Sequence, residues 1–291
     1  MTVLADNVVV LAKETQKERL RLLSISFPAL MLVTIVLVMP TTWLFWLSVY
    51  DGHEFTFVNF ARMINNTSYL EVFRLTFMVS IIVTVICVIL AYPLCYFISQ
   101  LSGMPAIVCL SIVLLPFWTS ILVRTYAWII LLQNTGIINT ALTRLGAISE
   151  PLPLLYNVTG TVIGMVHIML PFLVLPLYAS MKSIDPNYAR AAASLGATPI
   201  RAFWTVFVPL TLPGLFAGTL LVFIYCLGFY ITPQLLGGGR VVLVSMVIQQ
   251  NAAMYMHWGA SSAPGVVLLV ITLCIVFLIN KVFSLRAWFG G

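Results

Sequence analysis

The chain has 291 residues, of which 62% are hydrophobic and only 8% are charged. An ordinary soluble domain carries about 25% charged residues, so this composition excludes a protein whose whole surface faces water. The apolar runs are long and continuous, which favours an all-α polytopic membrane protein over a β-barrel with its short alternating strands. The net charge of +6 does not indicate a nucleic-acid partner, because the basic residues lie mostly near the ends of apolar runs.

Residues 1–26 form a polar segment ahead of the first apolar run, and we expect them to stay as a cytoplasmic tail. The run behind them is too long for the hydrophobic region of a cleavable signal. Residues 27–291 are expected to form a single transmembrane domain. Six of its runs are long enough to cross a bilayer as helices, namely 27–49, 75–99, 104–132, 158–181, 206–232 and 264–283.

The third run, 104–132, is long for one crossing and contains Arg124, so we expect its outer end to be broken or tilted. The connection after it contains the sequence IINTALTRL. Its apolar residues fall on one helical face, which predicts a short helix lying at the membrane surface.

Lysine and arginine set the expected orientation, because cytoplasmic loops carry an excess of them. With the N-terminus inside, nine of these residues are cytoplasmic and five are external. Six crossings then return the C-terminus to the cytoplasm. The cytoplasmic residues are Lys13, Lys17, Arg19, Arg21, Lys182, Arg190, Arg201, Lys281 and Arg286, and the external ones are Arg62, Arg74, Arg124, Arg144 and Arg240.

Cysteines offer no sign of a metal site or a disulfide framework. All of them lie inside apolar runs and none belongs to a CxxC pair, so we interpret them as small buried hydrophobic residues and predict no metal ligands. They are Cys87, Cys95, Cys109, Cys226 and Cys274.

Residues 183–204, SIDPNYARAAASLGATPIRAFW, interrupt the apolar sequence between the fourth and fifth runs. Asp185-Pro186 is a helix-start signal, Gly196 can supply the left-handed residue that ends a helix, and Thr198-Pro199 can start another. We therefore predict a bent pair of short helices in the cytoplasm. Small residues would leave a smooth face for a docking partner; an interfacial loop without a partner is the alternative.

This segment resembles the EAA loop of permease subunits of bacterial ATP-binding-cassette importers. Ala191, Ala192 and Gly196 match the family pattern, and the prolines at 209 and 213 occupy its LP region. The first glutamate of the pattern is replaced by Arg190, which reverses a charge. Residues 114–139 (LLPFWTSILVRTYAWIILLQNTGIIN) and 227–239 (LGFYITPQLLGGG) resemble the spermidine/putrescine branch of that family.

The resemblance implies a multi-pass protein of the bacterial inner membrane that forms half of a pore, with a second permease subunit as its partner in a heterodimer. It also implies two ATPase subunits and a periplasmic substrate-binding protein. The chain has no G-x-x-x-x-G-K-[ST] motif, so ATP and Mg²⁺ are expected on the ATPase and no cofactor in this chain. The ATPase-docking residues implied are Tyr188, Arg190, Ala191, Ala192, Leu195, Gly196, Ile200 and Phe203.

The implied substrate is a polyamine such as spermidine or putrescine; an opine, phosphonate, thiamine or ferric iron is the alternative. The six predicted spans contain no acidic residue, so weak cation–π contacts with aromatic rings are the expected interaction. An aromatic belt or lipid-facing packing is the alternative for each ring. The predicted path residues are Trp118, Arg124, Tyr126, Trp128, His167, Tyr225, Phe229 and Tyr230.

Two of these residues are ionisable and invite other interpretations. Arg124 could bind backbone carbonyls, pair with Glu150 or Asp51, or extend outward to the interface, and a cation is awkward on a polyamine path. His167 lies in the middle of a span, where a packing role competes with a path-lining one.

Other functional classes lack their signatures. An intramembrane enzyme would show HExxH, GxSxG or paired carboxylates within the spans, and none of these occurs. An ion-driven carrier would show inverted repeats and buried ionisable residues, which are hard to find here. Co-purification with an ATPase separates the importer from the carrier.

Overall fold

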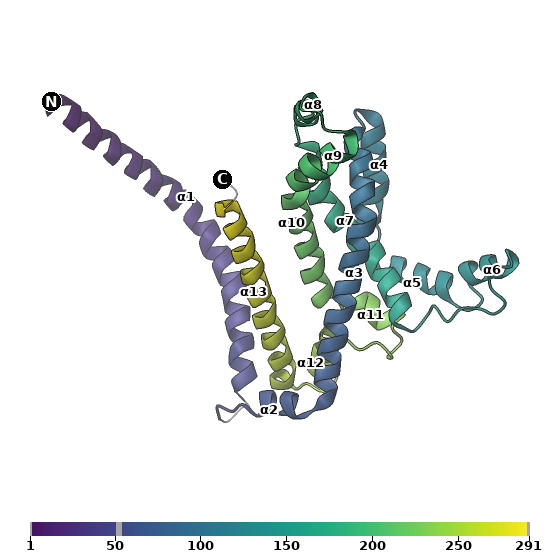
Figure 1. Cartoon of the computed structure of the whole chain (residues 1–291). Coiled ribbons are helices and arrows are strands. Elements are labelled where there is room, and N and C mark those ends of the chain that lie inside the picture. The colour runs from purple at the N-terminus through teal and green to yellow at the C-terminus, as the bar shows by residue number, and fades with distance from the viewer. Residues whose placement is uncertain (1, 51–53, 290–291) are drawn as a thin grey trace.

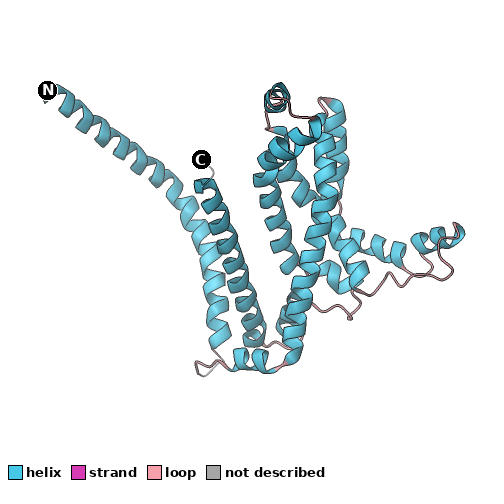
Figure 2. Cartoon of the chain, viewed as in Figure 1, coloured by secondary structure: helices cyan, strands magenta, loops and turns pink. Residues whose placement is uncertain are grey.

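The computed structural model of the chain describes residues 2–50 and 54–289 (Figure 1). Asp51, the side chains of the basic residues before the first span and the side chain of Arg286 lie outside this description. Across the described residues the regular elements are helical, apart from one isolated bridge between Tyr50 and Phe55 (Figure 2). The all-α prediction is therefore confirmed.

The helices follow one another through short connections. Their bounds are α1 Thr2–Val49, α2 Val58–Asn65, α3 Thr67–Gln100, α4 Met104–Leu114, the 3₁₀ helix η1 Leu115–Trp118, α5 Ile121–Leu132, α6 Ile137–Arg144, α7 Val158–Lys182, α8 Asn187–Ser194, α9 Pro199–Ala202, the π-helix η2 Phe203–Phe207, α10 Val208–Leu227, α11 Ile231–Leu236, α12 Val244–Ala253 and α13 Trp258–Phe289.

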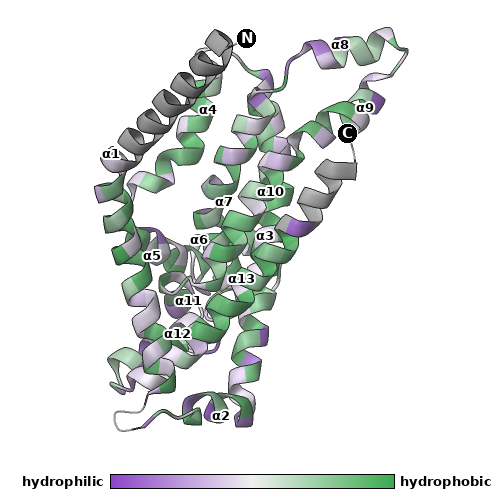
Figure 3. Cartoon of the chain, turned by 90° about the vertical axis from the view of Figure 1, so that its left-hand side faces the viewer, coloured by the Kyte–Doolittle hydropathy of each residue, from purple (hydrophilic) through white to green (hydrophobic). Residues whose placement is uncertain are grey.

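Six stretches within the described residues are long and apolar enough to cross a bilayer, as predicted. Hydrophobic residues, drawn in green, predominate along these helices in Figure 3, which suits lipid as their solvent. The stretches are Ser26–Val49, Thr67–Gln100, Ile121–Arg144, Val158–Lys182, Pro199–Leu227 and Trp258–Ile279.

The third predicted span, 104–132, is wrong as a continuous helix. Pro116 cannot donate a backbone hydrogen bond, the chain tightens into η1, and Thr119 and Ser120 are extended. The helix therefore breaks in its middle rather than at its outer end. The short helix predicted within IINTALTRL is present as α6, and α5 with α6 projects to the side of the molecule (Figure 1).

The fifth predicted span, 206–232, also needs correction at both ends. The helical stretch begins already at Pro199 and stops at Leu227. Gly228 ends α10, and Ile231 starts the separate short helix α11. Phe229 and Tyr230 consequently lie in a connection and not on a spanning helix.

Helix α7 forms the centre of the fold, packed between α3 and α10. Two glycines on α10 allow the close approach to α7. A Cβ atom at Gly214 would collide with the Ser180 side chain and lie 2.8 Å from the Pro176 carbonyl oxygen, and one at Gly218 would lie 3.0 Å from the Leu173 carbonyl oxygen. Small residues serve membrane helices in this way, because packing is the main force that holds such helices together.

Helices α1 and α13 pack along each other beside this core, and α13 touches α10 only weakly. Figure 1 shows that the N-terminal end of α1 and the C-terminal end of α13 lie at the same end of the molecule as α8 and α9. Helices α2 and α12 lie at the opposite end. The N-terminal end of α1, the C-terminal end of α13 and residues 183–204 thus lie at one end of the molecule.

We expect Gly214→Ala to destabilise the helical core, because the added methyl group meets backbone and side-chain atoms of α7. Overpacking of this kind costs about 1–3 kcal/mol. The midpoint of thermal unfolding in detergent should fall. The control is Gly228→Ala, where a Cβ atom meets nothing within 4 Å. Equal midpoints for the two variants would contradict the proposed close packing.

Candidate functional site

The start of α8 is built by Asp185, as predicted. Its Oδ1 accepts a hydrogen bond from the backbone N–H of Asn187 at 2.8 Å, so the carboxylate satisfies an amide at the helix N-terminus. Pro186 occupies the N-cap rather than the first helical position, and the helix begins one residue later than the sequence pattern indicates.

Gly196 ends α8 in the left-handed conformation that the sequence predicts, with φ +83°. The N–H of Gly196 donates to the carbonyl of Ala193 at 2.9 Å, and the N–H of Ala197 donates to that of Ala192 at 3.0 Å. This pair of bonds is the Schellman motif, which satisfies the carbonyl groups left open at a helix C-terminus. Helix α8 is therefore a discrete element with two defined ends.

The second short helix predicted in this segment does not stand alone. Thr198 Oγ1 accepts from the N–H of Arg201 at 3.4 Å and Pro199 opens the helix, as expected. However, α9 runs through η2 into α10 without interruption. The wide π-turn of η2 lies just before Pro209, which has no N–H for the helical ladder. The segment is thus one free helix plus an extension of the fifth span.

A cavity of about 610 Å³ separates α8 from the ends of α3, α7 and η2. Ala189, Arg190 and Ala193 of α8 line this cavity. Part of the small-residue face therefore points toward the membrane domain and away from the solvent-exposed outer surface. Leu195 is 90% exposed and Ile200 is also exposed, so these two apolar side chains project outward.

The remaining predicted docking residues occupy different environments. Tyr188 is exposed and lines the cavity edge, and Ala191 and Gly196 are exposed. Ala192 is half-buried. Phe203 is half-buried too, stacked on Phe207 with ring centroids 5.8 Å apart. Phe203 therefore anchors the base of the segment.

Sequence reasoning missed the contacts that hold this base. Lys182 Nζ donates to the carbonyls of Ser99 and Leu101 at 3.3 and 2.8 Å, so the end of α7 caps the end of α3. Tyr92 OH and Thr211 Oγ1 form a hydrogen bond of 3.1 Å between α3 and α10. Their sequence positions gave no sign of these partners, which come from other helices.

The predicted path residues do not form one cluster. Trp118 is 88% exposed directly before the break in the third span, and Tyr126 is also exposed. Phe229 and Tyr230 are half-buried and pack against the core. Tyr225 is 47% exposed on α10.

A row of aromatic rings joins three helical elements near Tyr225. The ring of Phe172 on α7 lies 4.8 Å, centroid to centroid, from that of Tyr225 and 4.8 Å from that of Phe117 in η1. Phe117 and Phe172 were not predicted as site residues. The only sequence signal is that each stands next to a proline in an apolar span.

Trp128 and His167 interact across α5 and α7. Trp128 Nε1–H donates to His167 Nδ1 at 3.1 Å, and both side chains are half-buried. This bond fits the packing interpretation of the histidine. Arg124 lies one helical turn before Trp128, and its Nε is buried without a hydrogen-bond partner among the described residues. The structure shows no ion pair between Arg124 and Glu150, and Asp51 lies outside the described residues.

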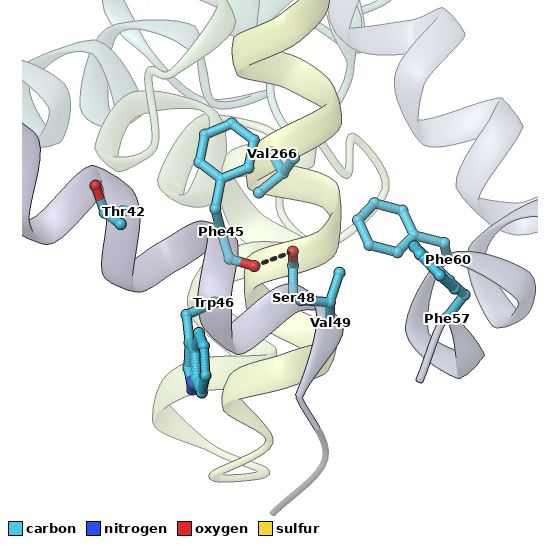
Figure 4. Close-up of a pocket in the computed structure, with 8 residues that line it drawn as sticks. All are labelled: Thr42, Phe45, Trp46, Ser48, Val49, Phe57, Phe60 and Val266. Carbon is cyan, nitrogen blue, oxygen red and sulfur yellow. Dashed lines mark hydrogen bonds between the residues drawn. The ribbon is translucent and has the colours of Figure 1, made fainter. Parts of the chain in front are cut away.

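The opposite end of the molecule carries a second hollow of about 460 Å³ between α1, α2 and α13 (Figure 4). Phe45, Trp46, Phe57, Phe60 and Val266 are among its lining residues. The hydroxyl of Ser48 is occupied, because it donates to the Phe45 carbonyl at 2.7 Å. Most of the lining side chains of this hollow are apolar, and Thr42 adds a second hydroxyl group. Among the described residues there is no cluster of three metal-ligating side chains.

Comparison with known proteins agrees with this architecture. Residues 89–287 match the family described as "Binding-protein-dependent transport system inner membrane component". The chain is 34% identical to the spermidine/putrescine transport system permease protein PotB of Haemophilus influenzae, over 78% of this chain and 81% of that protein. It is 32% identical to the inner membrane ABC transporter permease protein YdcU of Escherichia coli, over 69% of this chain and 67% of that one.

Solved structures share the fold. A bacterial ABC transporter involved in the import of the acidic polysaccharide alginate superposes with a TM-score of 0.70, over 94% of this chain and 97% of that chain, at 17% identity. The matched family covers more than half of the chain, including α7, α8 and α10. The chain therefore belongs to the family of binding-protein-dependent transport system inner membrane components, as the permease subunit of an ATP-binding-cassette importer of the inner membrane.

Proposed function

We propose that this chain forms one half of a pore that imports a polyamine such as spermidine or putrescine. The substrate is proposed because the chain has 33–34% sequence identity to permeases named for spermidine and putrescine transport. We further propose that the other half is a distinct homologous permease subunit, and that a periplasmic binding protein delivers the substrate.

The direct test of this proposal uses the complete complex in proteoliposomes. Radiolabelled putrescine or spermidine should accumulate only when ATP and the cognate binding protein are both present. Uptake without ATP would favour the ion-driven carrier. Uptake of ferric iron or an opine in place of polyamines would keep the importer role and reject the substrate.

We propose that residues 183–204 dock onto a separate ATPase subunit that carries ATP and Mg²⁺, since this chain has no phosphate-binding loop of its own. Helix α8 suits this role because both of its ends are fixed by hydrogen bonds and Leu195 projects from it. The exposed residues Ala191, Gly196 and Ile200 complete the proposed contact, and Arg190 takes the place of a family glutamate.

A continuous helix would transmit movement of the docked segment to the pore. Residues 199–227 form an unbroken helical stretch from the docking end to the aromatic row at Tyr225. Lys182 ties the preceding span to α3 at the same end. We propose that ATP-driven displacement of α8 tilts α10 as a unit and so opens or closes the path.

Aromatic rings would give a polycation weak contacts along this path. The exposed rings of Trp118, Tyr126 and Tyr225 are the proposed first contacts, with Trp128, Phe229 and Tyr230 behind them. A cation–π contact contributes about 0.5–2 kcal/mol, which is enough to attract an amine and weak enough to release it. His167 supports Trp128 in this arrangement through their hydrogen bond.

The side of the membrane is tested by labelling. We propose that α8 and both chain ends are cytoplasmic, following the charge bias. A membrane-impermeant thiol reagent should label Leu195→Cys in inside-out vesicles but not in intact spheroplasts. Phe55→Cys, at the opposite end and exposed, should show the reverse pattern. Labelling of Leu195→Cys in intact spheroplasts would overturn the orientation and the docking role together.

The docking role is tested at Gly196. Valine there must adopt φ +83° in open space, so the strain acts on the backbone without a steric clash. An L-residue in the left-handed conformation costs about 1–2 kcal/mol. This cost lowers the population of molecules with the α8 terminus formed about five- to thirty-fold. We expect Gly196→Val to lower the ratio of polyamine uptake to ATP hydrolysis in proteoliposomes.

Gly146→Val is the matched control for this experiment. Gly146 also has a positive φ, +70°, with nothing near its missing side chain, but it lies beyond the end of α6. Its substitution imposes the same kind of strain away from the proposed docking surface. If both variants changed the uptake-to-hydrolysis ratio equally, the effect would reflect general strain, and the docking assignment would fail.

The aromatic path is tested by removing two of its exposed rings, one in η1 and one on α10. We expect the double variant Trp118→Ala, Tyr225→Ala to reduce polyamine uptake about five- to thirty-fold, because two exposed cation–π contacts together contribute about 1–2 kcal/mol. The pair Trp118→Phe, Tyr225→Phe keeps both ring faces and should lose less. Stimulation of ATP hydrolysis by the binding protein serves as the control for assembly. Unchanged uptake by the alanine pair would remove both residues from the path.

A further inference from the structure

Arg124 is a cation without a partner inside a candidate membrane span. The residue lies in the second turn of α5 and is half-buried. Its Nε is enclosed and has no hydrogen-bond partner among the described residues. An arginine side chain stays charged in proteins, so it cannot escape the cost of burial by losing a proton. Full removal of such a charge from water costs several kcal/mol, and the half-buried Arg124 bears part of that cost unless an opposite charge lies nearby.

The neighbouring helices do not supply an acceptor. Helix α5 packs against α11, α6 and α7. Toward α6, the Oδ1 atom of Asn139 already accepts a hydrogen bond from the backbone N–H of Leu152 at 2.9 Å. Toward α11, the hydroxyls of Thr125 and Thr232 are engaged with each other at 3.2 Å. Toward α7, His167 Nδ1 already accepts the proton of Trp128. These polar groups are therefore committed to contacts that do not include the guanidinium.

The described carboxylates of the chain do not pair with Arg124 either. Among the described residues the acidic side chains are Glu54, Glu71, Glu150 and Asp185, and the structure records no ion pair between any of them and Arg124. Asp185 directly precedes α8, and its carboxylate accepts a hydrogen bond from the backbone N–H of Asn187. A carboxylate that pairs with Arg124 would therefore come from outside the described part of this chain.

The same helix exposes apolar side chains to the outside of the chain. Leu122, Val123, Tyr126 and Ile130 on α5 are all exposed, and Trp118 stands exposed immediately before it. In Figure 1, α5 and α6 project sideways from the helical core with no other helix beyond them. An uncovered helical surface of this kind, with an unpaired cation at its margin, suits a second membrane protein more than hydrocarbon alone.

We propose that a carboxylate of the second permease subunit pairs with Arg124 and that this site is incomplete in the single chain. The inference rests on the proposed two-subunit pore. A polyamine carries no negative group, so the substrate cannot supply the missing charge. A partner carboxylate would remain in place between transport cycles and would satisfy the guanidinium permanently.

The experiment uses the full complex, extracted in mild detergent through a tag on this chain. The quantity measured is the second permease subunit retained per chain after washing. We expect Arg124→Gln to retain about tenfold less, because loss of one member leaves the partner's carboxylate buried and unpaired. Arg124→Lys keeps the charge but not the planar guanidinium and should retain an intermediate amount. The control, Arg144→Gln, removes an exposed arginine on α6 and should behave as wild type.

A charge exchange identifies the carboxylate that pairs with Arg124. It also distinguishes loss of this contact from misfolding of the variant chain. In the Arg124→Glu background, each Asp and Glu of the second permease subunit is changed to Arg in turn. One exchange should restore retention to near the wild-type amount, and the others should not. A misfolded chain would not be rescued by any change in another subunit.

Three results would overturn the proposal. They are wild-type retention by Arg124→Gln, reduced retention that no charge exchange restores, and wild-type retention with a raised KM for spermidine, which would make Arg124 a path residue. Failure of the proposed function has a different signature, because the wild-type chain would then retain neither a second permease subunit nor an ATPase.

Discussion

The contact between α7 and α10 is the constraint on which the rest of the structure depends. In a bilayer, apolar side chains gain little by leaving lipid for one another, so helices associate where their backbones can approach closely. Gly214 and Gly218 provide that approach on α10, against Pro176 and the Leu173 carbonyl of α7. The prolines belong to the same arrangement, because a carbonyl freed by a missing N–H is tolerated where neighbouring helices, hydroxyl side chains, water or a local change of helix type satisfy it. The result is a packed unit of α3, α7 and α10 with α7 at its centre.

This unit provides a fixed base for residues 183–204, the proposed docking segment. Lys182 and Tyr92 connect the three helices by hydrogen bonds at the end where α8 begins, so the base of the segment is held firmly. Helix α8 itself stands off from that base across the cavity, joined on one side by the Asp185 turn and on the other by Gly196. The π-helical turn η2 lies between this free helix and α10. Such turns are frequent at functional sites, and here it lets Pro209 enter the span without ending it.

The features that sequence predicted well are those fixed by neighbours along the chain. The α8 end at Gly196 and the start at Asp185 depend on bonds spanning two to five residues. Hydrophobic length alone identifies six candidate spans, although it misplaces the bounds of the third and the fifth. The break at Thr119–Ser120 was misplaced because an apolar run gives no signal for where it will bend, beyond Pro116 itself. Phe172 and Lys182 were missed because their roles arise from rings and carbonyls on other helices. The small-residue face of α8 was identified, but its direction relative to the membrane domain was a tertiary property.

Electrostatics links the unpaired arginine to the proposed substrate. A polycation moving along a wall with no carboxylate and one bare guanidinium would meet repulsion that grows as water is excluded. Aromatic contacts of about 0.5–2 kcal/mol could not offset a full charge of the same sign in a low-dielectric path. Pairing Arg124 with a partner carboxylate neutralises that field at its source. The two halves of the pore would then create a path that is neutral overall, in which the weak attraction of Trp118 and Tyr225 is enough to guide the substrate.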